Sequence, residues 1–216
     1  MTKDYLDHAG VTLLPGYLDP DLQRPMTFGE VGCFLSHYNI WKDIEKKGYK
    51  KALILEDDAK FIPRFRRQWC RIFADVQEFV SNWDLLYLGR KRNKPEDEYP
   101  VNDCNYLVWP NYSYWTVAYA ITYTGVKKLL HQKPLTKMIT LDEFLPTMFD
   151  KNPEGGRSWN KKFFPRNLIA LSTNPLLIEP AWYSGNPGHY TDTNDAYIVL
   201  EDERDGDDQQ IIKDEL

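Results

Sequence analysis

The chain has 216 residues, of which 42% are hydrophobic, 14% aromatic and 27% charged, a composition that excludes disorder over most of its length and suits one large domain with a sizeable core. The net charge of −5 lies in residues 201–216, where eight acidic and two basic residues sum to −6, so the nearly neutral remainder lacks the basic face that a nucleic acid needs. No apolar run approaches the roughly 20 residues that span a bilayer. The sequence also lacks the basic start and following apolar stretch that are typical of a signal peptide.

The first predicted element is a helix over residues 27–47. Residues 1–26 contain several glycines and prolines without regular periodicity, which predicts an irregular lead-in. Thr27 and Glu30 then form a capping-box pattern, and apolar residues recur behind them at helical spacing. Gly48 follows the last turn and can end the helix.

Helices and short apolar strands alternate through residues 27–131, which favours an α/β sheet layered with helices. After the first helix we predict, in chain order, a strand over residues 51–55, a helix over 65–79, a strand over 84–88, a loop over 93–105, a strand over 115–122, a helix ending near His131 and a short helix over 141–149. Prolines are frequent over residues 146–187, which predicts mostly loop with one strand at 176–178. The last 16 residues are predicted to be disordered.

Three adjacent acids, Glu56, Asp57 and Asp58, follow the strand over residues 51–55 directly. In open α/β sheets, ligands bind beyond the carboxyl ends of strands. Adjacent carboxylates repel one another unless a cation is near, and their hard oxygens suit Mg²⁺ or Mn²⁺ bridged to phosphates. The alternative is a solvated turn that caps the next helix. The abrupt change from apolar to acidic residues favours the metal site.

The predicted helix over residues 27–47 contains Gly32, Ser36 and His37. Glycine disfavours a helix by about 1 kcal/mol relative to alanine, so Gly32 suggests a close backbone approach. Ser36 and His37 could face a ligand, but their spacing alone favours an exposed pair.

Three cysteines, Cys33, Cys70 and Cys104, are too few and too widely spaced for a disulfide framework or a zinc knuckle. One bridge with one remaining thiol stays open.

Five segments, in this order, resemble glycosyltransferase family 25, and most of all the carboxy-terminal half of its animal procollagen galactosyltransferases. The resemblance covers roughly residues 5–195. The segments are FGEVGCFLSHYNIW at 28–41, LILEDD at 53–58, WDLLYLGRKR at 83–92, YSYWTVAYAIT at 112–122 and LDEFLPTMFD at 141–150.

This resemblance implies a GT-A type nucleotide-sugar transferase fold that moves galactose from UDP-galactose to collagen hydroxylysine, with inversion and with Mn²⁺. It places the metal-binding motif at the acidic triplet, with Asp58 as the first candidate ligand and Glu56 beside it. In many GT-A folds a residue near the carboxyl end of the domain completes the coordination of the metal. The candidates for this ligand are His189 and Asp192. The residues implied to bind the donor are Ser36, His37, Glu56, Asp57 and Arg90.

The general base is sought among carboxylates, because inverting transfer to an alcohol needs one within hydrogen-bond reach of the attacking oxygen. Asp142 matches the position at which such folds carry this base, and Glu143 is the alternative. Both acids would also suit a helix start by compensating its dipole.

The sequence departs from the family pattern at its amino end. The first βαβ unit, which grips the uridine in this fold, is not evident before the helix over residues 27–47. We therefore expect a fragment of a longer protein, or a chain that has lost part of its donor pocket, with poor solubility and weak transfer. The expected division is a lead-in at 1–26, a transferase domain at 27–200 and an acidic tail at 201–216.

The chain ends in KDEL, Lys213–Leu216, an address that its receptor reads for the endoplasmic reticulum lumen. A glycosylation sequon at Asn111 would be used only in that compartment. Three functions follow: a collagen-type galactosyltransferase, a catalytically silent relative that acts as a binding or adhesion module, and a lipooligosaccharide galactosyltransferase. The KDEL end argues against the third.

Overall fold

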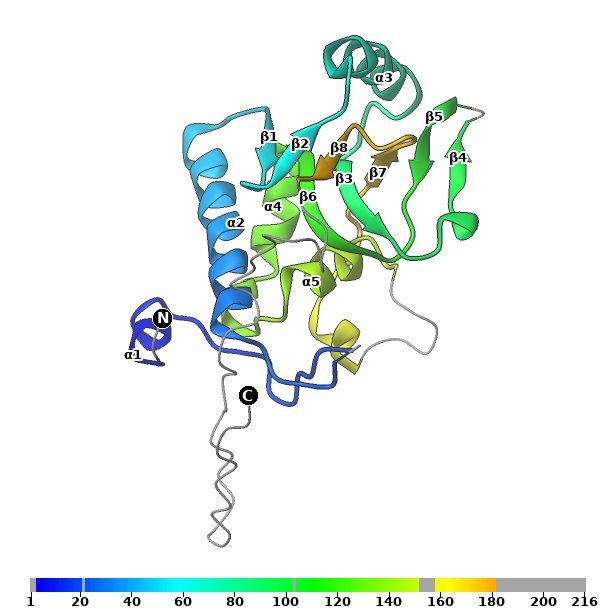
Figure 1. The fold of residues 1–216 in the computed structure, drawn as a ribbon. Coiled ribbons are helices and arrows are strands. Elements are labelled where there is room, and N and C mark those ends of the chain that lie inside the picture. Colours follow the sequence, from blue (N-terminus) through cyan, green and yellow to red (C-terminus); the bar gives the residue numbers. More distant parts are fainter. Residues whose placement is uncertain (1–2, 21, 103, 152–157, 182–216) are drawn as a thin grey trace, which may run out of the picture.

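The computed structural model describes residues 3–20, 22–102, 104–151 and 158–181, which form a mixed α/β fold (Figure 1). No helix of these residues is long and apolar enough to cross a membrane. The helices are α1 Lys3–His8, α2 Phe28–Lys47, α3 Phe65–Phe79, α4 Tyr123–His131 and α5 Leu141–Met148, with short 3₁₀ turns at Pro95–Asp97, Pro134–Thr136 and Ser158–Lys162. The strands are β1 Lys51–Leu55, β2 Ala59–Phe61, β3 Leu85–Arg92, β4 Tyr99–Val101, β5 Cys104–Trp109, β6 Ser113–Thr122, β7 Ala170–Thr173 and β8 Ile178–Pro180.

The main sheet has six strands in the order β1-β6-β3-β7-β5-β4, and β2 pairs with β8 in a second sheet. β6 is antiparallel to both β1 and β3, so those two strands run in the same direction. β7 is parallel to β3. The carboxyl ends of β1, β3 and β7 therefore lie on one side of the sheet, beside the amino end of β6.

Two hydrophobic clusters cover the two faces of this sheet, because side chains alternate along a strand. On β3, Leu85 and Tyr87 belong to the cluster shared with α2, α4 and α5. Leu86 and Leu88 belong to the other cluster, which α3 covers. Figure 1 shows α2 alongside α4, with α3 at a distance from both. The prediction of a sheet layered with helices is confirmed.

The predicted helix over residues 27–47 is confirmed as α2, and its caps are the predicted ones. The Thr27 hydroxyl accepts a hydrogen bond from the Glu30 N–H at 3.1 Å, and a Glu30 carboxylate oxygen accepts one from the Thr27 N–H at 2.8 Å. Gly48 ends the helix in the left-handed region, with φ 69°, and its N–H donates to the Ile44 carbonyl at 2.9 Å.

Two predicted loops contain strands. The stretch at residues 93–105 forms β4 and the start of β5, which pair with each other. In the proline-rich stretch, β7 was missed, and the strand predicted at 176–178 is wrong except that β8 begins at Ile178. β7 forms because it pairs with β3 and β5, which are distant in sequence, and local composition does not register such partners.

The lead-in is mostly irregular, as predicted, apart from the short helix α1. It packs into the main core just ahead of α5. Leu13 and Met138 form a β-bridge, and the Leu14 N–H donates to the Met138 carbonyl at 2.9 Å. The Tyr17 and Thr140 hydroxyls are hydrogen bonded at 2.8 Å. The lead-in thus supports the segment that begins α5, and a domain boundary at residue 27 stays a prediction.

β1 is an edge of the six-stranded sheet in the described part of the chain. Ile54 is buried, but Leu53 and Leu55 on the other face are 45% and 42% exposed. An apolar, unpaired edge strand is a surface prone to association, so poor solubility of this chain remains our expectation.

Candidate functional site

The acidic triplet lies in the turn between β1 and β2. The Glu56 N–H donates to the Val117 carbonyl of β6 at 3.0 Å, and the Ala59 N–H closes the turn onto the Glu56 carbonyl at 3.2 Å. Asp57 is exposed, whereas Glu56 and Asp58 are half-buried. The turn leads into a strand, and α3 begins later behind Arg64, so the interpretation as a cap for the next helix is wrong.

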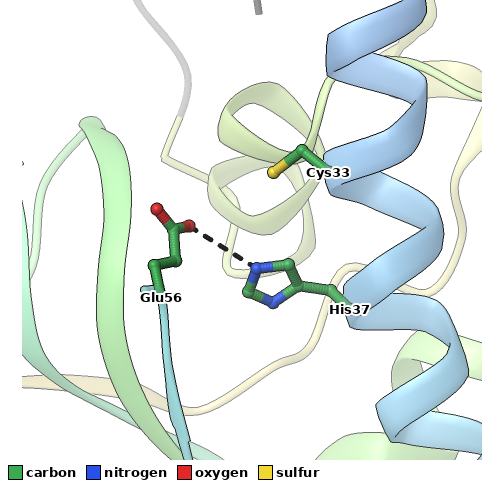
Figure 2. Close-up of side chains that lie close together, drawn as sticks. All are labelled: Cys33, His37 and Glu56. Atoms are coloured by element: carbon green, nitrogen blue, oxygen red, sulfur yellow. Dashed lines mark ion pairs between the residues drawn. The ribbon is translucent and has the colours of Figure 1, made fainter. Parts of the chain in front are cut away.

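His37 lies on the inner face of α2, opposite Glu56. Its Nε2 is 3.5 Å from a Glu56 carboxylate oxygen (Figure 2), and its Nδ1 is 2.9 Å from the Tyr119 hydroxyl. The imidazole stacks on the Tyr119 ring at 15°, and the Trp41 indole N–H donates to the same hydroxyl at 2.9 Å. Trp41 of α2 and Tyr119 of β6 therefore fix the orientation of the imidazole.

The exposed pair favoured by spacing is wrong for His37, which is buried. Ser36 is exposed, and its hydroxyl donates to the Gly32 carbonyl one turn earlier at 2.9 Å. Donor binding by either side chain stays a prediction. The sequence could have predicted that His37 points inward, because it lies on the same helical face as Phe34 and Trp41.

Cys33 lies one turn before His37 on the same side of α2, and sequence reasoning missed it as a site residue. The thiol sulfur, the imidazole nitrogen and the Glu56 carboxylate oxygen all lie within 4.8 Å of one another (Figure 2). The spacing of Cys33 and His37, four residues apart on a helix, is the signal that could have found it. Cys33, Cys70 and Cys104 are all thiols, so the bridge left open by the sequence is not formed.

Asp142, the second residue of α5, faces the same region. The Thr116 hydroxyl donates to its carboxylate at 3.0 Å, and the Trp115 backbone N–H is a second donor. Burial, followed by the nearby Glu56 carboxylate, raises the pKa of Asp142 from 3.8 to about 6, against the lowering effects of its two donors and of His37. A carboxylate with this pKa is deprotonated at neutral pH yet more basic than an ordinary aspartate.

The backbone of β6 is irregular where it supports Asp142. Trp115 has φ 50°, a left-handed conformation that costs a non-glycine residue on the order of 1–3 kcal/mol and that concentrates at functional sites. The β3–β6 register shifts beside it, between Gly89 and Lys91. Neither Thr116 nor Trp115 was singled out from the sequence, because an apolar strand pattern gives no sign of such an irregularity.

Glu143, the alternative base, points elsewhere. Its side chain is fully buried, and its carboxylate accepts hydrogen bonds from the hydroxyls of Tyr112 and Tyr114. Burial is the main cause that raises the pKa of Tyr114, with the Tyr112 hydrogen bond and the Glu143 charge adding to it. Adjacent acids on α5 thus have different surroundings, and the choice of base stays a prediction.

Arg90 is enclosed within the sheet. Its guanidinium forms an ion pair with Glu98 at 2.7 Å, with side chains that are 0% and 1% exposed. It also donates to the hydroxyls of Ser172 at 3.0 Å and Ser113 at 2.8 Å. These contacts join β3, β6 and β7 to the segment ahead of β4, and donor binding by Arg90 stays a prediction.

Three predicted features remain: the glycosylation sequon, the additional metal ligands and the KDEL end. Of these, the structure describes only the sequon. Asn111 of the sequon is half-buried, and its side-chain oxygen accepts a hydrogen bond from the Tyr112 N–H at 2.8 Å. Its use as a glycosylation site stays open. His189, Asp192 and the KDEL end lie outside the described residues.

Comparison with known proteins identifies the family. The sequence model of glycosyltransferase family 25, described as an LPS biosynthesis protein, matches residues 8–145. A glycosyltransferase 25 family member of Anopheles gambiae is 46% identical over 202 residues, covering 94% of this chain and 33% of that protein. Procollagen galactosyltransferase 1-A of Xenopus laevis is 43% identical over 199 residues, covering 92% and 32%.

A human relative is named inactive glycosyltransferase 25 family member 3, and it is 47% identical over 193 residues, covering 89% of this chain and 32% of its own. The chain thus spans about a third of the length of the curated relatives it matches. The resemblance seen in the sequence is confirmed, and the mixed α/β fold is consistent with a GT-A-like domain. The chain belongs to glycosyltransferase family 25.

Proposed function

We propose that this domain transfers galactose from UDP-galactose to hydroxylysine of collagen, with inversion at the anomeric carbon. Family membership and the similarity to a procollagen galactosyltransferase support the reaction class and the acceptor. The observation that carries the proposal is Asp142, a carboxylate with a pKa of about 6 beside the acidic end of β1. A base of this strength suits proton abstraction from an alcohol at neutral pH.

In the proposed reaction, Asp142 accepts the proton of the hydroxylysine hydroxyl while that oxygen attacks C1 of galactose. A new C1–O bond forms, the bond from C1 to the β-phosphate oxygen breaks, and UDP leaves with the electron pair. Thr116 and the Trp115 N–H hold the carboxylate in position throughout. Protonation of Asp142 relieves the repulsion from Glu56, which favours the proton transfer.

We assign the metal of the donor to Glu56, Asp57 and Asp58, with Asp58 as the first candidate ligand. The donor set fits Mn²⁺, since it offers carboxylate oxygens and since Glu56 already places excess negative charge close to Asp142. When bound, the ion would neutralise charge on the departing diphosphate. We propose His189 or Asp192 as a further ligand.

We propose residence in the endoplasmic reticulum lumen, where procollagen is the partner and the KDEL receptor retains the protein through Lys213–Leu216. The chain covers about a third of its relatives, so its activity, partners and location are proposals.

A second candidate is a catalytically silent member that acts as a binding or adhesion module. Relatives from human, mouse and rat that are 45–47% identical are named inactive or probable inactive. A third is a lipooligosaccharide galactosyltransferase, which the description of the family model favours.

A transfer assay separates these candidates. The 216-residue chain is incubated with UDP-galactose and either hydroxylysine-containing collagen or a lipooligosaccharide, with Mn²⁺ or with a chelator. We expect weak galactosylation of hydroxylysine that requires Mn²⁺. Metal-dependent binding of UDP-galactose without transfer to either acceptor would contradict the proposal and support a silent member, and transfer to the glycan alone would support the third candidate.

A further inference from the structure

Cys33, His37 and Glu56 bring together a thiol, an imidazole and a carboxylate, three of the common protein ligands for transition metals. α2 supplies the first two from consecutive turns, and the end of β1 supplies the third. Figure 2 shows the three side chains converging on the space between α2 and that strand end. Their ligand atoms lie within 4.8 Å of one another.

The separation of His37 from Glu56 fits coordination better than a hydrogen bond. The distance from Nε2 to the carboxylate oxygen is 3.5 Å. A charge-assisted hydrogen bond is about 2.7–2.9 Å long, so this contact is loose for an ion pair. Two ligands each about 2.0 Å from a tetrahedral zinc ion stand roughly 3.3 Å apart. The pair already has the spacing of two such ligands.

The surroundings of His37 hold it in a ligating orientation. Its Nδ1 is bonded to the Tyr119 hydroxyl at 2.9 Å, and Trp41 donates to the same oxygen at 2.9 Å. Histidines that bind metals commonly donate their other ring N–H to a neighbouring oxygen, which fixes the ring. In the metal-bound state His37 would donate its Nδ1–H to the Tyr119 oxygen. The nitrogen directed at the cluster is Nε2, and His37 is 4% exposed.

We propose that Cys33, His37 and Glu56 bind Zn²⁺ or a divalent cation of similar softness, with water in the fourth position. Glu56, whose side chain is 31% exposed, gives the solvent side of this site. On binding, the Cys33 thiol loses its proton to solvent and the sulfur coordinates as thiolate. Thiolate and imidazole select Zn²⁺ over Mn²⁺ and Mg²⁺, so the site differs in preference from the all-carboxylate set of the proposed function and shares only Glu56 with it.

Co²⁺ is the probe, because a thiolate bound to cobalt gives a charge-transfer absorption that oxygen and nitrogen ligands do not. The experiment titrates the reduced 216-residue chain with Co²⁺, without nucleotide, and then displaces the Co²⁺ with Zn²⁺ while calorimetry follows Zn²⁺ binding. The variants are Cys33→Ser, Glu56→Gln and the matched control Cys70→Ser, whose thiol is exposed on α3. Circular dichroism establishes that each variant is folded.

We expect the charge-transfer band in the wild type and in Cys70→Ser, and its loss in Cys33→Ser. Zn²⁺ affinity should fall ~10-fold or more in both Cys33→Ser and Glu56→Gln. A wild type without the band, a band that persists in Cys33→Ser, or one that disappears in Cys70→Ser would overturn the proposal. Mn²⁺ binding should be equal in the wild type and Cys33→Ser. Its absence in both would count against the metal of the proposed function and leave this site standing.

Discussion

Asp142→Asn should stabilise the folded protein above pH 6, because the native fold holds the Asp142 carboxylate in an unfavourable setting. Burial and the Glu56 charge raise its pKa from 3.8 to about 6. Between those values the folded state keeps a proton that the unfolded state has released. The stability contribution is therefore fully present below the unfolded pKa and is lost as the pH rises through the folded pKa.

The size of this effect follows from the shift of about two pKa units. Each pKa unit corresponds to about 1.4 kcal/mol, so the free energy of unfolding of the wild type falls by about 3 kcal/mol between strongly acidic and neutral pH because of this residue. This is an upper value, since Asp142 keeps some exposed surface. Asparagine carries no charge, so the Asp142→Asn variant does not undergo this pH-dependent loss of stability. A hydrogen bond that the substitution breaks lowers the stability by the same amount at every pH. The pH-dependent part of the stability difference between variant and wild type therefore reports the effect of the Asp142 charge.

The assay is thermal and denaturant unfolding of both proteins at about pH 4 and about pH 7.5, with chelator present. We expect the stability of Asp142→Asn relative to the wild type to rise by about 2.4 kcal/mol between these conditions, because the unfolded carboxyl is already partly ionised at pH 4. That corresponds to roughly 5–10 °C in Tm for a chain of this size. The matched control is Asp150→Asn, which removes an exposed carboxylate that pairs with Arg166 at 2.9 Å. Losing an attractive pair cannot raise the relative stability with pH, so this variant should show no such rise. A pH-independent difference for Asp142→Asn would refute the argument.

Three further predictions concern the metal, the core and the tail. Asp58→Ala should abolish Mn²⁺-dependent UDP binding and leave the fold intact, and calorimetry that finds undiminished binding would reject the assignment. Arg90→Ala should destabilise the protein by about 1–3 kcal/mol, because the buried Glu98 carboxylate then keeps only Arg92, at 2.6 Å, of its two arginine partners; denaturant unfolding measures this, and a loss below about 0.5 kcal/mol would contradict it. Deleting Lys213–Leu216 from a chain given a signal peptide should cause secretion, whereas continued retention would mean that another contact holds it.

The elements that were predicted correctly have local causes. The capping box of Thr27 and Glu30, the apolar periodicity behind it and Gly48 together determine α2 within a short stretch of chain. β1 and the acidic turn that follows it are likewise local, since a short apolar run ends at consecutive acids.

The elements that were missed depend on partners far away in the sequence. β5 and β7 form because they pair with each other, with Leu107 opposite Thr173. The site depends even more on tertiary contacts. Only the fold brings Cys33 of α2, Glu56 of the turn after β1 and Asp142 of α5 to the same end of the sheet. The sequence indicated acids at a strand end, but it held no sign of the burial and of the Glu56 charge that raise the pKa of Asp142.

The most direct test of the proposed function compares turnover and donor binding in Asp142→Asn. Galactose transfer from UDP-galactose to hydroxylysine-containing collagen is measured with Mn²⁺ for the wild type, Asp142→Asn and Glu143→Gln, together with the affinity of each for UDP-galactose. If Asp142 is the base, its variant should bind the donor normally and lose turnover by about 10² or more, the lower range of what acid–base catalysis contributes. Near-normal turnover in Asp142→Asn, with the larger loss in Glu143→Gln, would contradict the account.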